Sequence, residues 1–300
     1  MGHVVRMRLL ARLLAERGLS VCFASKPNTP GWDYLAAAGM PLTDTLPTRG
    51  NIGICDIEHG PSENMLGNLK TTFRRVVTVY GGHSFPLAAP DAVECLSDLV
   101  VCQSLFEFDR PAHVLQGTKY LLLDPAYAEC RPNVAGPVVV CMGGADPHCL
   151  SGRVAHALVG LGRTVKVVVG QAAQDPFTEM RPLNALPVYA PTTLVPHLAG
   201  ASLFVGALGM VAYEALAAGV PVILYAWSDN HKATADELQR RGVGRSLGLW
   251  NDFDPVKLRN CVETWLAESK LLPRYQRRAR ELVDGGGAAR VAARIRELLR

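Results

Sequence analysis

Residues 203–225 read LFVGALGMVAYEALAAGVPVILY, and this stretch decides the fold of the chain. It predicts a buried strand that ends near Gly206, a turn of small residues, a helix, and a second buried strand after Gly219 and Pro221. Fully apolar strands joined by helices are typical of a parallel sheet that is covered on both faces. The N–H groups at the start of the helix lack partners and carry the positive end of its dipole, so they favour an anion. We therefore predict a diphosphate-binding turn at this point.

The residues of this turn are the predicted diphosphate contacts. Small residues let a ligand approach the backbone, and Glu214 lies about one turn into the helix, where it can accept hydrogen bonds from a ribose diol. The alternative is an ordinary helix with a surface glutamate and a glycine that ends it. The whole sequence of strand, turn, helix, GVP and strand favours binding. The predicted contacts are Ala207, Leu208, Gly209, Met210 and Glu214.

The same alternation of short apolar runs and amphipathic helical stretches continues through the chain. Residues 138–142 and 165–169 are apolar runs that suit strands buried on both faces, and helical stretches follow them. This alternation predicts an α/β fold of doubly wound, Rossmann-like units. The late segment from about residue 255 to residue 300 is predicted to be helical.

A length of 300 residues suits two domains of about 130 to 160 residues. The stretch ECRPNVAGP contains prolines and a glycine, and it lies between two series of strands and helices. We therefore predict a Rossmann-like N-terminal domain over 1–133 and a nucleotide-binding C-terminal domain over 137–300, facing a cleft. The last helices are candidates to return to the N-terminal domain.

The chain opens on MGHVVRMRLLARLLAERG, which resembles a turn and a helix with no strand before them. A domain of this type normally begins with a central strand that leads into such a turn. We therefore expect the first strand and its loop to be missing from the given sequence.

Composition limits the classes of partner. Lysine and arginine total 31 against 27 aspartates and glutamates, so the formal net charge is +4. The densest basic region, 274–300, spaces its arginines as a helix does and includes glutamates, which favours a solvated pair of helices over a nucleic-acid surface. No apolar run approaches the ~20 residues that a membrane span needs. We expect neither a nucleic-acid partner nor a membrane span.

Eight cysteines are scattered along the chain without a CxxC pair. Several lie inside apolar runs such as VCFAS and VVVCM, which indicates buried, reduced thiols and not a disulfide framework or a zinc site. No secretion signal is evident at the start. The sequence therefore predicts a cytoplasmic protein.

Gly143 and Gly144 follow the predicted strand 138–142 and form a second candidate ligand turn. A chain that passes close to a ligand at the carboxyl end of a strand needs such residues. The alternative is a plain turn from strand to helix, with Asp146 and Ser151 competing to cap the helix.

Two further candidate sites lie at predicted helix starts. His3 beside Gly2, with Arg6 one turn later, could act as a general base near neutral pH, whereas a helix cap or a surface histidine is the alternative. Asn230 and His231 follow the strand after the phosphate turn, so they are expected near the same ligand. Capping of that helix by Asp229 or Asn230 is their alternative explanation.

Four sequence blocks coincide with a known family. GHVVRMRLLARLLAERG, GTKYLLLDPAY, VCMGGADPHCLSGRVAHAL and GALGMVAYEALAAGVPVILYAWSDNHKATADEL occur in this order. Together they resemble the UDP-sugar hydrolases of pseudaminic acid biosynthesis and their spore-coat polysaccharide relatives. That family shares the two-domain fold of the B-type glycosyltransferases.

The resemblance implies a small-molecule substrate, a UDP-linked 2,4-diacetamido-trideoxyhexose. Water would attack the anomeric carbon and UDP would leave, without a metal or another cofactor. By motif match, His3 would activate the water, the turn 206–210 would hold the diphosphate, and Glu214 would bind the ribose. Asn230 and His231 would lie near the sugar.

The chain departs from this family at two places in its first half. Relatives carry paired aspartates where this sequence reads VYGGH at 79–83, and they carry an arginine where it has Asp124. Both places lie in the half that would recognise the sugar. Two alternatives therefore stand beside hydrolysis, namely a glycosyltransferase with a UDP-sugar donor and a non-catalytic nucleotide-sugar binding protein. Metal binding by Asp56, His59 and His83 has no supporting spacing.

Overall fold

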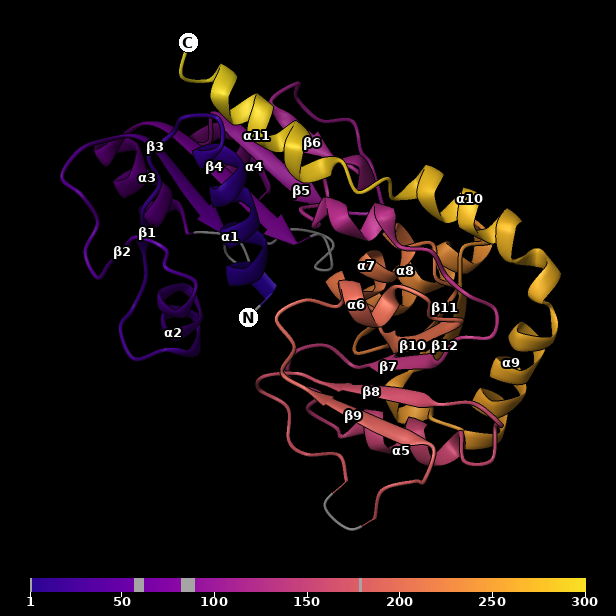
Figure 1. The fold of residues 1–300 in the computed structure, drawn as a ribbon. Helices are drawn as coiled ribbons and strands as arrows, with labels where there is room; N and C mark the ends of the chain where they lie inside the picture. Colours follow the sequence, from indigo (N-terminus) through magenta and orange to yellow (C-terminus); the bar gives the residue numbers. More distant parts are fainter. Residues whose placement is uncertain (1, 57–61, 82–89, 178–179) are drawn as a thin grey trace. The chain divides into compact units, whose positions relative to one another are not determined.

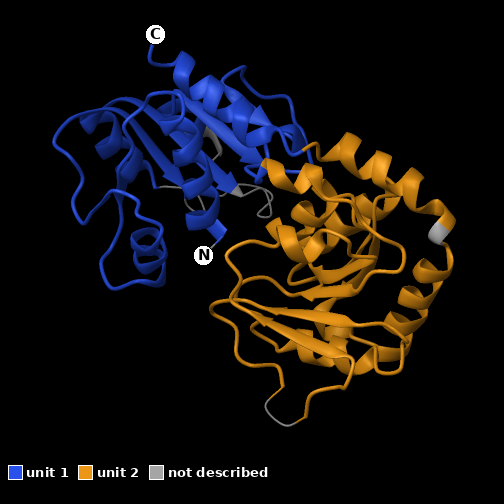
Figure 2. Cartoon of the chain, viewed as in Figure 1, with its two compact units in different colours: residues 1–124, 285–300 blue, residues 125–284 orange. Residues whose placement is uncertain are grey.

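A computed structural model describes the chain over residues 2–56, 62–81, 90–177 and 180–300. The chain divides into two compact units: residues 1–124 and 285–300 form unit 1, and residues 125–284 form unit 2 (Figure 2). Both units are α/β structures with parallel sheets, as the sequence predicts. No helix within these ranges is both long and apolar enough to cross a membrane.

The described part of unit 1 has six strands, all parallel to their neighbours: β1 (Phe23–Ala24), β2 (Leu42–Thr43), β3 (Gly50–Asp56), β4 (Phe73–Gly81), β5 (Leu99–Gln103) and β6 (Val114–Gln116). β1 pairs with β2, and the other four form one sheet in the order β3-β4-β5-β6. The runs VVTVY and LVVC form the two central strands, because a strand covered on both faces requires continuous apolar residues.

Helices cover both faces of the four-stranded sheet. On one face, Leu10 and Leu14 of α1 and Ile295 of α11 share a buried core with Val79 and Val101. α1 and α11 lie side by side there, although almost the whole chain separates them (Figure 1). Leu66 and Leu69 of α3 cover the opposite face. The helices of unit 1 are α1 (Gly2–Ala15), α2 (Pro30–Ala37), α3 (Glu63–Thr72), α4 (Pro90–Leu96), α11 (Gly287–Glu297) and the short η1 (Thr118–Tyr120).

The described part of unit 2 has one parallel sheet of six strands: β7 (Val138–Cys141), β8 (Val165–Val169), β9 (Ala185–Tyr189), β10 (Leu203–Ala207), β11 (Val222–Ala226) and β12 (Arg245–Leu249). Their order is β12-β11-β10-β7-β8-β9. β7 is therefore central, and the direction of winding reverses between β7 and β10. In open α/β sheets, such a switch point is where ligands bind, outside the carboxyl ends of the strands.

The core of unit 2 follows from the apolar runs of its strands. Val140, Val167 and Val205 pack against Leu150 of α5 and Leu258 of α9 on one face of the sheet. The helices of unit 2 are α5 (Leu150–Ala157), α6 (Val195–Leu198), α7 (Met210–Ala217), α8 (Asp229–Arg240), α9 (Pro255–Ala267), α10 (Leu272–Leu282) and the short η2 (Pro125–Glu129), η3 (Trp250–Asp252) and η4 (Ser269–Leu271).

The two units do not follow the predicted domain limits of 1–133 and 137–300. The chain passes into unit 2 at Asp124 and returns to unit 1 at Gly285. The early crossing arises because η2 packs against α6 and α7, and it buries Tyr127 within unit 2. The late return arises because the apolar face of α11 completes the core under α1.

The return of α11 predicts that a distant substitution weakens unit 1. Ile295→Ala should lower the free energy of unfolding of unit 1 by about 2–5 kcal/mol, because it leaves a cavity in a buried core. Hydrogen exchange monitored by mass spectrometry should show faster exchange in β3, β4 and β5 and no change in unit 2. The exposed Arg296→Gln on the same helix is the control. Faster exchange confined to unit 2 would contradict the assignment of α11.

Candidate functional site

Three polar side chains of unit 1 meet at the carboxyl end of β3. Asp56 is the last residue of β3, and His3 and Arg6 lie one turn apart at the start of α1. His3 Nδ1 is 2.7 Å from Asp56 Oδ1, and Arg6 Nε donates to Asp56 Oδ2 at 2.7 Å. Arg6 Nη2 lies 2.5 Å from Asp56 Oδ1 and 2.8 Å from His3 Nδ1. These three residues form the His3/Asp56/Arg6 cluster.

Asp56 is the charged centre of this cluster. Its side chain is 3% exposed, whereas that of His3 is 29% exposed. Burial raises the pKa of Asp56, but the hydrogen bonds from His3 and Arg6 outweigh burial and hold this pKa below its ordinary value. The carboxylate is therefore ionised at neutral pH, and Arg6 compensates its charge through two hydrogen bonds.

The cluster can set the tautomer of His3. Arg6 can only donate, so its contact favours a His3 Nδ1 that accepts; Asp56 can only accept, so its contact favours a Nδ1 that donates. Both contacts are charge-assisted, but Arg6 Nη2 already has an acceptor in Asp56 Oδ1 at 2.5 Å, so it does not need His3 Nδ1 as one. In the tautomer that donates to Asp56, Nε2 carries the lone pair that a general base needs.

The sequence analysis names Asp56 as a possible metal ligand without supporting spacing, and it does not link Asp56 to His3 or Arg6. Its position directly after the apolar run GIC was the available signal, because the carboxyl ends of parallel strands carry functional side chains. His59 and His83 lie outside the described residues. Over the ranges that the structure describes, no three His, Cys, Asp or Glu side chains gather in a group that could hold a metal ion.

The predicted diphosphate turn lies at the switch point of unit 2. β10 extends to Ala207, so Ala207 is a buried strand residue and the turn itself is Leu208 and Gly209. Gly209 is the N-cap of α7 and offers no side-chain cap to the helix. A Cβ atom on Gly209 would meet nothing within 4 Å. The start of α7 therefore has uncapped N–H donors beside open space, as an anion site requires.

The two helices that begin at the same edge are capped by their own residues. Asp146 accepts from Leu150 N–H at 2.9 Å and from Ser151 N–H at 3.0 Å, and so caps α5. Ser228 caps α8 by accepting from His231 N–H at 3.4 Å. The alternative explanation, a cap by Asp229 or Asn230, is thus wrong, because α8 begins one residue earlier than that explanation requires. Of α5, α7 and α8, α7 is the helix that lacks a side-chain cap.

Gly143 and Gly144 lie on the β7 side of this site. The pairing of β7 with β10 joins Cys141 to Gly206, and the two glycines follow this strand in a turn. Their carbonyl oxygens pack against Gly170, where a Cβ atom would lie 2.4 Å from Gly144 O. Asp146 caps the following helix, as the alternative explanation of this turn expects, and a ligand role for the glycines stays a prediction.

The other predicted residues of unit 2 lie on α7 itself and on α8. Glu214 lies one turn into α7 and is half-buried. Burial, and then the charge of Glu214, raises the pKa of the Tyr127 hydroxyl. Asn230 and His231 lie in the first turn of α8, which follows β11, the neighbour of β10. Their contact with a sugar stays a prediction.

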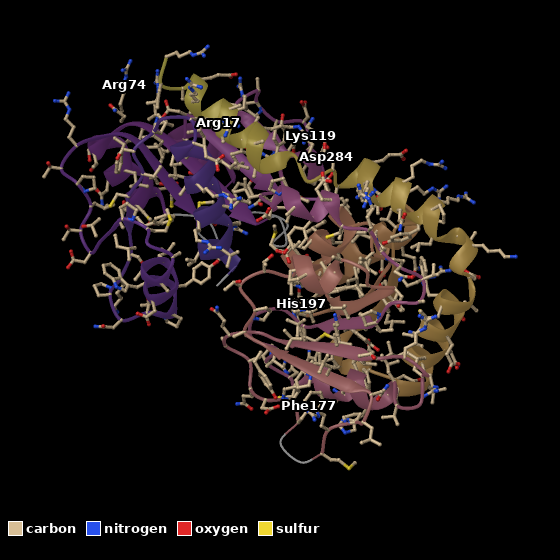
Figure 3. The ribbon with its side chains drawn as sticks, in the orientation of Figure 1. Arg17, Arg74, Lys119, Phe177, His197 and Asp284 are labelled. Carbon is tan, nitrogen blue, oxygen red and sulfur yellow. The ribbon has the colours of Figure 1, made fainter. Side chains whose placement is uncertain are left out.

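His197 on α6 is a titratable residue of unit 2 that the sequence analysis did not single out (Figure 3). Burial, aided by the charge of Lys166, lowers the pKa of His197, so its imidazole is neutral at neutral pH.

The two departures from the family pattern lie in unit 1. Asp124 stands where relatives carry an arginine, and its Oδ2 lies 3.9 Å from Arg12 Nη2, so its carboxylate takes part in a surface ion pair. The other departure, VYGGH, falls partly outside the described residues.

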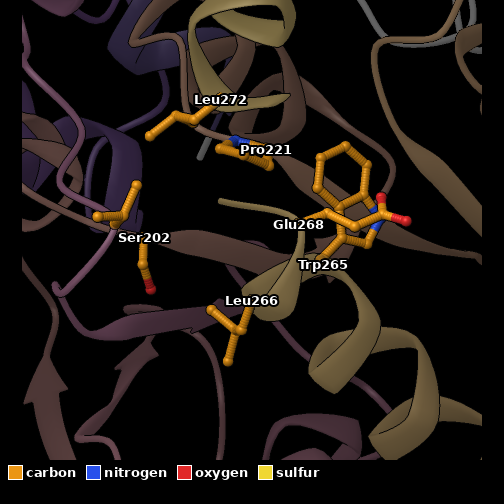
Figure 4. Close-up of a pocket in the computed structure, with 7 residues that line it drawn as sticks. Ser202, Pro221, Trp265, Leu266, Glu268 and Leu272 are labelled. Atoms are coloured by element: carbon orange, nitrogen blue, oxygen red, sulfur yellow. The ribbon is translucent and has the colours of Figure 1, made fainter. Parts of the chain in front are cut away.

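A shallow hollow of about 290 Å³ lies elsewhere in unit 2 (Figure 4). Ser202 and Pro221, which precede β10 and β11, line it, so the hollow is at the amino edge of the sheet. The start of α7 lies at the opposite, carboxyl edge. The hollow is therefore separate from the predicted diphosphate turn. Its lining is Val134, Ser202, Pro221, Trp265, Leu266, Glu268 and Leu272.

Two Rossmann-like units in one chain define the B-type glycosyltransferase fold, and comparison with known proteins agrees. No model of a protein family matches the chain. The spore coat polysaccharide biosynthesis protein SpsG of Bacillus subtilis (strain 168) is 24% identical over 324 residues, covering 99% of this chain and 94% of SpsG.

Solved structures are similar over nearly the whole chain. MurG of Acinetobacter baumannii matches with a TM-score of 0.67 and 17% identity, over 99% of this chain and 96% of MurG. The spinosyn rhamnosyltransferase SpnG, complexed with thymidine diphosphate, matches with a TM-score of 0.68 and 18% identity, over 99% and 97%. The predicted fold and the resemblance to spore-coat polysaccharide proteins are confirmed, while membership of the pseudaminic acid hydrolases stays a prediction.

The charge arrangement around Asp56 predicts a pH-dependent loss of stability. The lowered pKa of Asp56 means that its stabilising contribution is fully present above the ordinary aspartate pKa of about 3.9 and disappears as the pH falls through the folded value. Asp56→Asn should lower the free energy of unfolding by about 3–5 kcal/mol at pH 7, because it leaves the charge of Arg6 buried without its partner.

Denaturant titrations of both proteins between pH 7 and pH 2 check this prediction. The difference between wild type and Asp56→Asn should shrink as the pH falls, since a protonated aspartate resembles asparagine. Asp33→Asn, at an exposed position of α2, is the control and should leave the pH profile unchanged. A difference that stays constant down to pH 2 would exclude an ionised Asp56 as the cause.

Proposed function

We propose that this protein is a glycosyltransferase that takes its sugar from a nucleoside diphosphate sugar. The observation that carries the proposal is the contact of His3 Nδ1 with the buried Asp56 carboxylate at 2.7 Å. This contact orients an imidazole as a general base at the carboxyl edge of a Rossmann-like sheet. The similarity of the whole chain to glycosyltransferase structures supports transfer as the reaction.

The proposed reaction substitutes one oxygen for another at the anomeric carbon. The hydroxyl of an acceptor forms the new bond to that carbon and gives its proton to His3 Nε2. The bond between the anomeric carbon and the diphosphate oxygen breaks, and the diphosphate leaves with the electron pair. The uncapped start of α7 stabilises the negative charge that grows on the leaving group.

The proposed donor follows from the helix start and the relatives. Gly209 and Met210 supply backbone N–H groups to the diphosphate, and Glu214 accepts from the ribose. The N–H of Leu208, also a predicted contact, donates to Tyr225 O at 2.8 Å and is not available to a ligand. SpnG was solved with thymidine diphosphate, which supports a nucleoside diphosphate in this fold. Uridine as the base and a diacetamido sugar are proposed from the sequence resemblance.

Hydrolysis of the nucleotide sugar is the second candidate function. The His3/Asp56/Arg6 cluster would activate water by the same proton transfer, and the block GHVVR resembles that of UDP-sugar hydrolases. Whether the reaction is transfer or hydrolysis depends on whether an acceptor hydroxyl or a water molecule lies opposite the leaving group. A non-catalytic binding protein would hold the nucleotide and turn nothing over.

Removal of the base tests the proposed chemistry. Release of nucleoside diphosphate from UDP-sugars, measured with and without candidate acceptors, should fall about 10²- to 10⁴-fold in His3→Gln. Dependence of the release on an acceptor would identify transfer, and release in water alone would identify hydrolysis. His113→Gln, at another half-buried imidazole of unit 1, is the control. Undiminished release in His3→Gln would rule out His3 as the base.

The helix start can be tested by giving α7 a cap of its own. Gly209→Asp should imitate Asp146 of α5, because φ of 167° is extended backbone and a Cβ atom meets nothing there. The new carboxylate should weaken UDP binding by more than tenfold, since it occupies the anion site, and should keep or raise the melting temperature.

Calorimetry with UDP, together with thermal unfolding, measures both effects. Gly209→Asn is the matched control, because it caps the helix without a negative charge and should weaken binding less. Equal UDP affinity in wild type and Gly209→Asp would show that the diphosphate binds elsewhere.

A further inference from the structure

A histidine contacts two tryptophans at the carboxyl edge of the sheet in unit 2. His148 lies in the loop between β7 and α5, and it is exposed. Its ring stacks on the ring of Trp250, with 3.4 Å between the ring centroids and 3° between the planes. The ring of Trp227 is tilted by 50° to that of His148, with 5.6 Å between the centroids. Trp227 directly follows β11, and Trp250 directly follows β12.

The order of the strands places these rings beside the predicted diphosphate turn. β10 lies between β7 and β11 in the sheet, so the contact of His148 with Trp227 is made across the carboxyl end of β10. Ala207, the last residue of β10, belongs to the core against which Trp227 and Trp250 pack. The turn 208–209 follows Ala207 directly. His148 therefore lies next to the start of α7.

The start of α7 and His148 border this turn from opposite faces of the sheet. The crossover from β7 to β8 contains α5, and the crossover from β10 to β11 contains α7; the two step in opposite directions across the sheet. Because crossovers between parallel strands are right-handed, α5 and α7 cover opposite faces. A diphosphate at this edge thus has the N–H groups of Gly209 and Met210 on one side and His148, just before α5, on the other.

The hydrogen-bonding groups of the His148 ring are available to a ligand. An imidazole has at least one N–H donor in either charge state. Its N–H bonds lie in the ring plane, so the parallel indole of Trp250 does not cover them. Within the described ranges, neither ring nitrogen of His148 forms a hydrogen bond. The stack therefore orients the ring without using its donor.

The backbone around His148 is also held in place. Asp146 and Cys149 adopt left-handed conformations, with φ of 40° and 48°, which cost energy for residues other than glycine. The carboxylate of Asp146 accepts from two N–H groups at the start of α5. Ala172 N–H donates to Gly144 O at 2.9 Å on the other side of the loop. The loop is thus ordered before a ligand binds, which lowers the entropic cost of binding.

We propose that His148 donates a hydrogen bond to the distal phosphate of the nucleoside diphosphate, the one that carries the sugar, and that Trp250 is its positioning residue. The proposal rests on the proposed function, in which the start of α7 binds the diphosphate. Trp227 leads into α8, where the sugar is predicted, whereas Glu214 on α7 is predicted to hold the ribose. His148 is therefore on the sugar side of the diphosphate. A donor there stabilises the negative charge that develops on the leaving group.

Calorimetric titration of the full chain with UDP and with UMP tests the proposal. UMP lacks the distal phosphate and is the internal reference. His148→Phe keeps a planar ring on Trp250 and removes the donor. It should weaken UDP binding about tenfold or more, because a hydrogen bond to a charged group is lost, and it should change UMP binding little. Its melting temperature should equal that of wild type, since His148 is exposed and the stack remains.

Trp250→Leu tests the positioning role. The variant frees the ring of His148, so it should weaken UDP binding less than His148→Phe does. In the double variant the loss should equal that of His148→Phe alone, because Trp250 acts through His148. His148→Gln keeps an N–H donor and should bind UDP more tightly than His148→Phe.

His156→Phe is the matched control. His156 is another exposed imidazole of unit 2, on α5, and its Nδ1 lies 2.8 Å from Gly152 O. Its replacement makes the same chemical change one helix turn or more away from the loop. Binding of UDP and of UMP should both be unchanged.

The outcomes separate the proposal from the proposed function. A wild-type protein that binds neither UDP nor UMP would contradict the proposed function, and with it the proposal. UDP binding that is unchanged in His148→Phe would overturn the role of His148 and leave the proposed function standing. An equal loss of UDP and UMP affinity in His148→Phe, or the same loss in His156→Phe, would show a general effect and would also overturn that role. Additive losses in the double variant would overturn the positioning role of Trp250.

Discussion

The parallel direction of the strands is the constraint on which both units depend. Because every strand in a sheet points the same way, each crossover helix begins at the carboxyl edge, and its unpaired N–H groups collect there. Local sequence then decides what each helix start can bind. Asp146 and Ser228 satisfy two of these starts in unit 2, and Gly209 leaves the start of α7 uncapped.

In unit 1 the same constraint brings charged side chains together at the carboxyl edge of the sheet, whereas at that edge of unit 2 a helix begins without a side-chain cap. Asp56 ends β3 and meets Arg6 and His3 of α1, so a buried negative charge is compensated within one turn of helix. Such a pair costs desolvation energy and adds little net stability. The presence of this ion pair beside the partly exposed imidazole of His3 is therefore explained better by the orientation of His3 than by folding stability.

Sequence patterns predicted the features that depend on neighbours along the chain. The apolar runs gave the strands and the parallel sheets, and the small residues before Met210 gave the uncapped helix start. Contacts between distant segments could not be predicted in this way. Asp56 and His3 are 53 residues apart, and no local pattern links them. The sequence did make the last helices candidates to return to the N-terminal domain, but not which of them joins the core formed by the first 124 residues. Pro125 directly follows the crossing at Asp124, but the place where η2 packs depends on the surfaces of α6 and α7, which lie far along the chain.

The interrupted path of the chain through unit 1 also reverses the usual order of folding during synthesis. Domains generally fold as they emerge, with the N-terminal one first. Here all of unit 2 lies between the two pieces of unit 1, so unit 2 is complete while unit 1 still lacks α11. Until that helix is made, the apolar faces of Leu10, Val79 and Val101 have no cover from Val291 and Ile295. During synthesis, the segment that is translated first, residues 1–124, therefore keeps an exposed hydrophobic surface until the last residues of the chain are made.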